Sequence, residues 1–147
     1  MAINSNDDLI KAGYRTWGDA DPFEDLIGPF YMKENDDGTH KAAFVAEADR
    51  HCNAGGMLHG GLLMSFADFS LFAIAKEALN GFGVTVAFNS EFVAAGQAGK
   101  LIEAVGEITR ATRSLIFVRG KIFSGDQTIM AFSGIIKKVK GAGEHKG

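Results

Sequence analysis

The longest apolar stretch of the chain, Leu62 to Ala75, contains a single ionisable residue, Asp68. The stretch is shorter than the roughly 20 residues that a membrane-spanning helix needs. Its apolar residues fall on nearly all sides of a helix, and a helix of that kind is buried in a protein core. We therefore expect a buried helix over about residues 59–79, ending at Asn80-Gly81, a common helix stop.

Asp68 needs a specific reason to lie in this helix. Burying an unpaired, ionised carboxylate costs several kcal/mol, so such a group acquires a partner or a raised pKa. No Lys or Arg lies within the apolar stretch, so a partner must come from another part of the chain. A carboxylate in a pocket suits a general base or a nucleophile. A structural carboxylate that caps a strand or pairs with Arg is the alternative, and the residues alone leave both roles open.

The segments around this helix predict an antiparallel sheet. Four runs rich in β-branched and aromatic residues follow the helix, and short connections between consecutive strands require antiparallel pairing. Two further strands, joined by a turn, precede it. Two short helices come first, one after Ser5 and one beginning at Pro22. The expected helices cover 6–14 and 22–28, and the expected strands 30–33, 39–48, 84–94, 100–112, 114–124 and 128–140. This order predicts an α+β domain whose sheet wraps around the buried helix.

Size and charge limit the functions that such a domain can have. The chain has 147 residues, which favours a single domain over 1–147 with one core. A net charge of -3 gives no basic field that would attract nucleic acid. Cys52 is the only cysteine, and the first ten residues lack the basic and apolar regions of a signal peptide. We therefore expect a cytoplasmic protein that binds neither nucleic acid nor membranes.

Polar residues and four glycines stand directly ahead of the buried helix, in the segment His51 to Gly61. Gly60 and Gly61 suit a tight turn, and they also suit an exposed helix N-terminus whose free N–H groups can stabilise an oxyanion. Asn53 can bind its own loop backbone or donate its amide to a carbonyl oxygen. His59 can orient the loop or contact a substrate.

A metal site is not expected in this segment. His51, Cys52 and His59 form at most a three-member cluster, and they lack the Cys-x-x-Cys pairing that is typical of zinc sites. Cys52 is also disfavoured as a nucleophile, because a free cysteine is more often simply buried.

The same residues resemble the hotdog-fold thioesterases, specifically the phenylacetate-pathway-like acyl-CoA thioesterases. The matching motif is His-x-Asn-x-x-Gly-x-x-His-Gly-Gly followed by a helix that carries Asp. Here it consists of His51, Asn53, Gly56, His59, Gly60, Gly61 and Asp68, with a second match at Gly83-Val84-Thr85-Val86. The motif is specific because residue types and spacings agree together. The resemblance covers about residues 21–140 and leaves 1–20 as an extension.

The resemblance implies a hotdog fold and the hydrolysis of acyl-CoA or aryl-CoA thioesters. Asp68 would be the catalytic carboxylate, while Asn53 and the Gly60 N–H would hold the thioester carbonyl. Thr85, where relatives often have Ser, would position water. General-base attack and a covalent anhydride route both stay open for Asp68.

Further residues are implied to bind substrate. His59 and Gly61 flank the helix start, and Arg110, Arg113 and Ser114 lie at a turn between strands that would approach the phosphates of coenzyme A. Arginine suits phosphate through its planar fork of donors. No metal or separate cofactor is implied, since coenzyme A arrives as part of the substrate.

Two other functions on the same fold remain as alternatives. A non-catalytic acyl-CoA-binding protein would have no need of a carboxylate such as Asp68. A hotdog dehydratase depends on a His paired with an acid, and nothing in the sequence singles out His59 for that role.

The spacing of the candidate residues also predicts an oligomer. If the helix begins near Gly60, Asp68 lies eight residues along it, or about 12 Å. Both groups cannot act on one carbonyl from that distance, because its carbon and oxygen are only about 1.2 Å apart. We therefore expect a two-fold homodimer in which Asp68 of one chain meets Gly60 and Asn53 of the other. The family that the chain resembles forms such dimers, often paired into tetramers.

Overall fold

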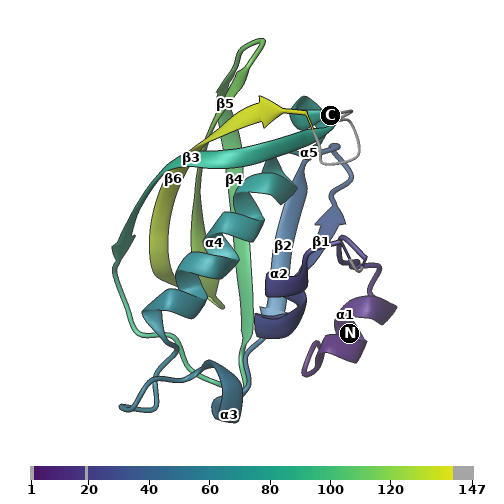
Figure 1. The fold of residues 1–147 in the computed structure, drawn as a ribbon. Helices are drawn as coiled ribbons and strands as arrows, with labels where there is room; N and C mark the ends of the chain where they lie inside the picture. Colours follow the sequence, from purple (N-terminus) through teal and green to yellow (C-terminus); the bar gives the residue numbers. More distant parts are fainter. Residues whose placement is uncertain (1, 19, 141–147) are drawn as a thin grey trace.

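A six-stranded antiparallel sheet curves around one central helix, α4 (Gly60–Ile74), in the computed structural model of residues 2–18 and 20–140 (Figure 1). The strands lie in the order β1-β2-β4-β5-β6-β3. Their bounds are Tyr31–Glu34 (β1), His40–Val45 (β2), Phe82–Phe92 (β3), Leu101–Ala111 (β4), Leu115–Ser124 (β5) and Gln127–Val139 (β6). The α+β class and the hotdog fold implied by the resemblance are both confirmed.

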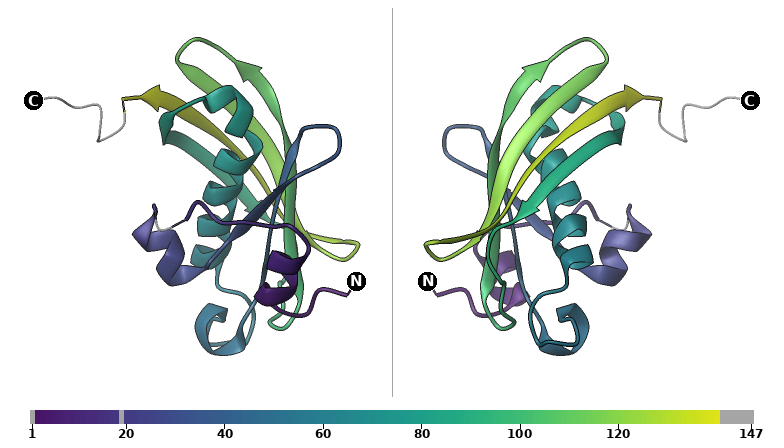
Figure 2. Two further views of the ribbon diagram at one scale, coloured as in Figure 1. Left: turned by 90° about the vertical axis from the view of Figure 1, so that its right-hand side faces the viewer. Right: turned by 90° about the vertical axis from the view of Figure 1, so that its left-hand side faces the viewer.

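Helix α4 packs closely against the sheet because glycines lie beneath it. A Cβ at Gly106 would come 2.7 Å from Ile74 Cδ1, and one at Gly134 would overlap the Leu71 side chain. The strands bend around the helix in both side views (Figure 2). Its buried face joins a core rich in phenylalanine, made of Phe30, Phe44, Phe66 and Phe69 with their aliphatic neighbours. This packing fixes the position of the whole helix, and with it the position of Asp68.

The two N-terminal helices begin where the sequence predicts. Ser5 Oγ accepts a hydrogen bond from Asp8 N at the start of α1 (Asn6–Lys11), and Asp21 Oδ1 accepts one from Glu24 N at the start of α2 (Pro22–Ile27). Such caps satisfy N–H groups that have no partner within the helix. None of the described helices is long and apolar enough to span a bilayer.

Three predicted elements are wrong in detail. The helix expected over 6–14 ends at Lys11. The helix expected over 59–79 is divided, because α4 ends at Ile74 and a separate turn of helix, α5 (Lys76–Leu79), follows before Asn80 takes a left-handed φ of 45°. The strand expected over 39–48 ends at Val45, and a short helix, α3 (Ala48–His51), follows it. The apolar pattern continues past Val45, but the His51 ring accepts a hydrogen bond from Glu47 N and closes a helical turn there.

The two edges of the sheet differ in length and in exposure. At one edge, the four-residue β1 is already paired on its outer side, where Arg15 and Met32 exchange two backbone hydrogen bonds of 2.9 and 2.8 Å. At the other edge, β3 has 11 residues and presents Phe82, Val84 and Val86, which are 57%, 42% and 53% exposed. The β3 edge is therefore a long, open and apolar surface, a combination typical of a pairing surface.

Candidate active site

Asp68 in the middle of α4 is held by a hydroxyl group from β3. Thr85 Oγ1 donates a hydrogen bond of 2.5 Å to Asp68 Oδ1. The pairing of β3 with β6 shifts register between Thr85 and Ala87, and such a bulge redirects the side chains beside it. Among the described residues, no Lys or Arg forms an ion pair with Asp68. Its partner is thus a hydroxyl group and not the cation that a structural ion pair would require.

Burial raises the pKa of the Asp68 carboxyl above its ordinary value. The hydrogen bond from Thr85 acts in the opposite direction and lowers that pKa, while the negative charge of Asp21 raises it. A carboxylate in this setting is a stronger base than one in water, and it is held in one orientation by a donor. Both properties suit general-base or nucleophilic chemistry.

Asp68 borders two cavities. The larger, of about 600 Å³, lies between the N-terminal segment at Trp17, the C-terminal half of α4 and the start of β3. The smaller, of about 300 Å³, is lined by Met64 and Phe88. Glu24 borders both cavities together with Asp68. A substrate in either cavity would therefore have the Asp68 carboxylate beside it.

The loop ahead of α4 is bonded to the oxygen of the Asn53 amide and not to its nitrogen. Asn53 Oδ1 accepts hydrogen bonds from Gly55 N at 2.9 Å and Met57 N at 3.2 Å, so the oxygen stabilises the loop. In the described part of the chain, the exposed Nδ2 group has no acceptor. The loop role and the carbonyl-binding role predicted for Asn53 are thus compatible, because they use different atoms.

His59 is the N-cap of α4. Its Nδ1 accepts a hydrogen bond of 2.8 Å from Gly61 N, so the Gly61 N–H is occupied within the chain. The Gly60 N–H has no acceptor among the described residues and remains available to a ligand. A Cβ at Gly60 would lie 3.3 Å from the Phe92 ring, and one at Gly61 would lie 3.1 Å from His59 Nδ1. Glycine at both positions keeps the helix start narrow and capped.

His51 fastens the loop to the rest of the molecule. It is buried; its Nδ1 accepts from Glu47 N, and its Nε2 lies 2.8 Å from the Ile27 carbonyl oxygen, to which it donates. Arg50 donates to two further carbonyls at the C-terminus of α2. The motif histidine therefore ties α2 to the segment that carries Asn53. In the described chain, no group of three or more His, Cys, Asp or Glu side chains could hold a metal ion.

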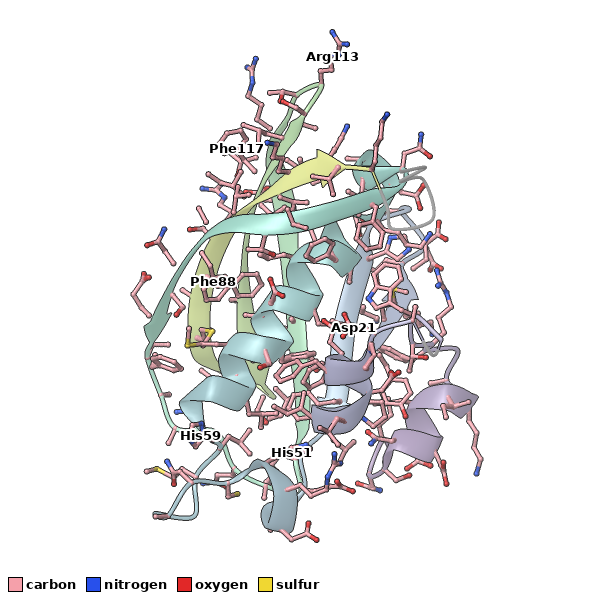
Figure 3. All side chains as sticks on the ribbon, in the orientation of Figure 1. Asp21, His51, His59, Phe88, Arg113 and Phe117 are labelled. Atoms are coloured by element: carbon pink, nitrogen blue, oxygen red, sulfur yellow. The ribbon has the colours of Figure 1, made fainter. Side chains whose placement is uncertain are left out.

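The arginines lie far from the helix start within one chain. Figure 3 shows Arg113 at the tip of the β4–β5 hairpin, at the opposite end of the molecule from His59. Arg110 belongs to β4, Arg113 and Ser114 form the turn, and all three side chains are exposed. The structure therefore brings together Asp68 and Thr85, and it carries Asn53 and Gly60 on one loop, which is closed by a hydrogen bond from His59 N to His51 O. The hairpin stands apart.

Several lining residues are missing from the sequence prediction, among them Trp17 and the two acidic residues Asp21 and Glu24. Asp21 lies beside the middle of α4 in Figure 3, across the helix from Phe88. The sequence around Pro22 indicates only a capped helix start, and that signal accounts fully for acidic residues at these positions. Their place beside Asp68 depends on how α2 packs against α4, which no local pattern encodes.

Comparison with known proteins agrees with the fold. The family model described as "Thioesterase superfamily" matches residues 55–131, which include α4 and most of the sheet. A Pseudomonas aeruginosa protein named "Putative esterase PA0474" is 27% identical over 130 residues, covering 86% of this chain and 95% of that protein.

Two solved structures extend the comparison. The PaaI protein from the phenylacetic acid degradation operon of Escherichia coli aligns with a TM-score of 0.71 and 20% identity over 92% of each chain. A hypothetical thioesterase protein from Streptococcus pneumoniae, solved with coenzyme A, has a TM-score of 0.67 and 17% identity over 76% of this chain and 86% of that chain. At these identities the two structures indicate the fold alone.

Proposed function

The chain belongs to the thioesterase superfamily, and we propose that it hydrolyses acyl-CoA or aryl-CoA thioesters to the free acid and coenzyme A. The observation that carries the proposal is Asp68: it is half-buried, oriented by Thr85, without a cationic partner among the described residues, and bordered by two cavities. The coenzyme A bound in the Streptococcus pneumoniae relative supports the choice of thiol.

The proposed reaction needs only water and the thioester. Either water activated by Asp68 or the Asp68 carboxylate itself attacks the thioester carbon, and Thr85 orients the carboxylate. Negative charge then develops on the carbonyl oxygen. The free Gly60 N–H and the free Asn53 amide are the donors that would stabilise it. In the general-base route, collapse of this intermediate releases the acid product and the coenzyme A thiolate, which takes the proton that Asp68 removed from water. In the nucleophilic route, collapse releases the thiolate and leaves the acyl group on Asp68 as a mixed anhydride, which water then cleaves to the free acid and the regenerated carboxylate.

The direct test is thiol release from a panel of acyl-CoA and aryl-CoA thioesters, followed with a thiol-reactive dye. We expect turnover on at least one of them above the rate of spontaneous hydrolysis. The Asp68→Asn variant is the control, because it keeps the shape of the side chain and removes the base. Thioester binding without turnover would instead favour the non-catalytic binding protein.

The proposed site is shared between two chains. Asp68 and Gly60 are eight residues apart on α4, about 12 Å, so one chain cannot present both groups to one carbonyl. Two chains joined along the open β3 edge would cover Phe82, Val84 and Val86. An antiparallel pair of α4 helices would bring Asp68 of one chain to Gly60 and Asn53 of the other. In the same assembly, Arg110 and Arg113 would bind the phosphates of coenzyme A.

Complementation between two inactive variants tests whether the active site is formed by two chains. Asp68→Ala and Asn53→Asp chains are unfolded, mixed in equal amounts and refolded together. Random pairing makes about half of the dimers hybrid, each with one intact site, so roughly a quarter of wild-type activity should return. Separately refolded variants are the control. Hybrid dimers without activity would show that both groups act from the same chain.

A further inference from the structure

The larger cavity beside Asp68 has a lining that is mostly apolar with two further acidic residues. Trp17, Phe72 and Leu79 are among the apolar residues, and Asp21 and Glu24 are the acidic ones besides Asp68. Thr85 and Asp68 lie at its border with α4 and β3. At about 600 Å³ the cavity is within the usual size of small-molecule sites. It has room for a group attached to a carbonyl that sits at Asp68.

The charge in this cavity has one sign. Asp21, Glu24 and Asp68 are its ionisable lining residues, and none of the described lining residues is Lys, Arg or His. An anion placed here would lose water without gaining a cationic partner, and it would lie near carboxylates. Burial of an unpaired charge is costly, and like charges in a cavity of low dielectric add to that cost.

We propose that this cavity binds the acyl group of the substrate, and that Asp21 and Glu24 make it select uncharged acyl groups and reject those that end in a carboxylate. The inference rests on the proposed thioesterase function and names the substrate class within it: monocarboxylic acyl thioesters, aliphatic or aromatic. Rejection of the wrong group by an unpaired charge gives specificity without a new attractive contact.

Glu24 makes the selection dependent on pH. Burial, together with the neighbouring Asp21, raises the pKa of Glu24 to about 8. The other charged groups that act on it are Asp68 on α4 and Asp25 on its own helix, both acidic. Glu24 is thus mostly neutral at pH 7 and ionised at pH 9. The cavity gains a negative charge over that interval, so rejection of an acyl carboxylate should strengthen.

The test compares hexanoyl-CoA with adipyl-CoA, which have six acyl carbons each and differ in the terminal carboxylate. The measured quantity is the kcat/KM for hexanoyl-CoA divided by the kcat/KM for adipyl-CoA, at pH 7 and at pH 9. This ratio cancels any effect of pH on the chemical step that the two substrates share. For the wild-type protein we expect a ratio of about 100 at pH 7, and a rise of several-fold at pH 9. In Glu24→Gln the ratio should stay constant with pH. In Asp21→Asn it should fall about tenfold at pH 9 and rise less between pH 7 and pH 9, because loss of Asp21 also lowers the pKa of Glu24.

Asp36→Asn is the control, because it removes an acidic charge at an exposed position in the turn between β1 and β2, outside the cavity linings and not among the groups that shift the pKa of Glu24. It should retain the wild-type ratio and its rise with pH. A wild-type ratio near one, a ratio that does not change with pH, or a rise that persists in Glu24→Gln would overturn the inference. Failure to hydrolyse either thioester, or any other in the panel, would contradict the proposed function itself.

Discussion

The two halves of the candidate site are stabilised in different ways. Short-range hydrogen bonds shape the half that carries Asn53 and Gly60. Asn53 accepts from two N–H groups of its own loop, and His59 accepts from Gly61 N at the start of α4. The half that carries Asp68 depends on a hydrogen bond from Thr85 on β3, 17 residues further along the chain, and Glu24 on α2 lines the same cavities. The first half is closed by local hydrogen bonds and fastened to the rest of the molecule through His51 and Leu58, whereas the geometry at Asp68 itself exists only when α4 and β3 are packed together.

This difference separates binding geometry from chemical reactivity. The donors of the loop are backbone and amide groups, whose strength changes little with their surroundings. The basicity of Asp68 is set by burial and by its neighbours, so distant substitutions can change it. We therefore expect variants of the loop to alter transition-state stabilisation, and variants around Asp68 to alter the pH profile.

Asp68→Asn should have the largest effect. Loss of the base or nucleophile is expected to reduce kcat by roughly two orders of magnitude or more. The fold should persist, and Tm should not fall at neutral pH. The pKa of Asp68 is raised in the folded protein, so its ionised form costs stability above that pKa, and a neutral amide removes the cost. Near-normal turnover would remove Asp68 from the mechanism.

Asn53→Asp separates the two atoms of the loop amide. The substitution keeps an oxygen that can accept from Gly55 N and Met57 N, and it replaces the free donor with a second acceptor. We expect kcat to fall about 100-fold, the typical loss for one oxyanion donor, with little change in Tm. A matched fall in activity and Tm would mean that Asn53 acts only as a loop residue.

Thr85→Ala should shift the pH dependence. The Thr85 hydroxyl lowers the pKa of Asp68, so its removal raises that pKa. Because the proposed base acts when ionised, the acidic limb of kcat/KM should move to higher pH, with about a tenfold loss at the wild-type optimum. Thr85→Ser retains the hydroxyl and should keep the wild-type limb. An unchanged limb in Thr85→Ala would exclude a role in tuning Asp68.

His59→Ala should have the smallest effect of the four variants, and that effect should be on stability. Loss of an N-cap costs about 1 kcal/mol, which lowers Tm by roughly 2–4 °C in a domain of this size. His59→Asn supplies a different capping oxygen and should restore Tm in a thermal unfolding measurement. If His59 also binds substrate, His59→Asn would have the Tm of the wild-type protein and still show a raised KM.

The local half of the site is the half that the sequence predicts well. The polar and glycine-rich segment before an apolar run indicates a capped helix start, and the helix does begin at Gly60. The number of the later strands follows from their short turns, and so does the pairing of β4 with β5 and of β5 with β6. The position of β3 does not, because β3 pairs with β6 and not with β4, the next strand along the chain. The sequence does not predict the division of the helix at Ala75 or the turn of helix at Ala48–His51, the second of which depends on a hydrogen bond from Glu47 N to the His51 ring.

The environment of Asp68 could not be predicted in the same way. The apolar run shows that Asp68 is buried and needs a partner, but the partner comes from 17 residues later, at Thr85. Glu24 lies further away in sequence, and its contact with the cavity depends on the position of α2. That position is fixed by hydrogen bonds from Arg50 and His51 to carbonyls at the end of α2. Such long-range contacts leave no periodic signal in the sequence.

The unequal edges of the sheet limit how many copies can join. A strand with an open edge is a template for another strand, and a sheet with two open edges could grow without end into a fibril. Here the Arg15 pairing occupies part of the β1 edge, and among the described strands β3 is the edge strand with a long row of free backbone groups. In the proposed dimer each chain would use its β3 edge once, so edge-to-edge pairing would close at two copies and would not continue into a polymer.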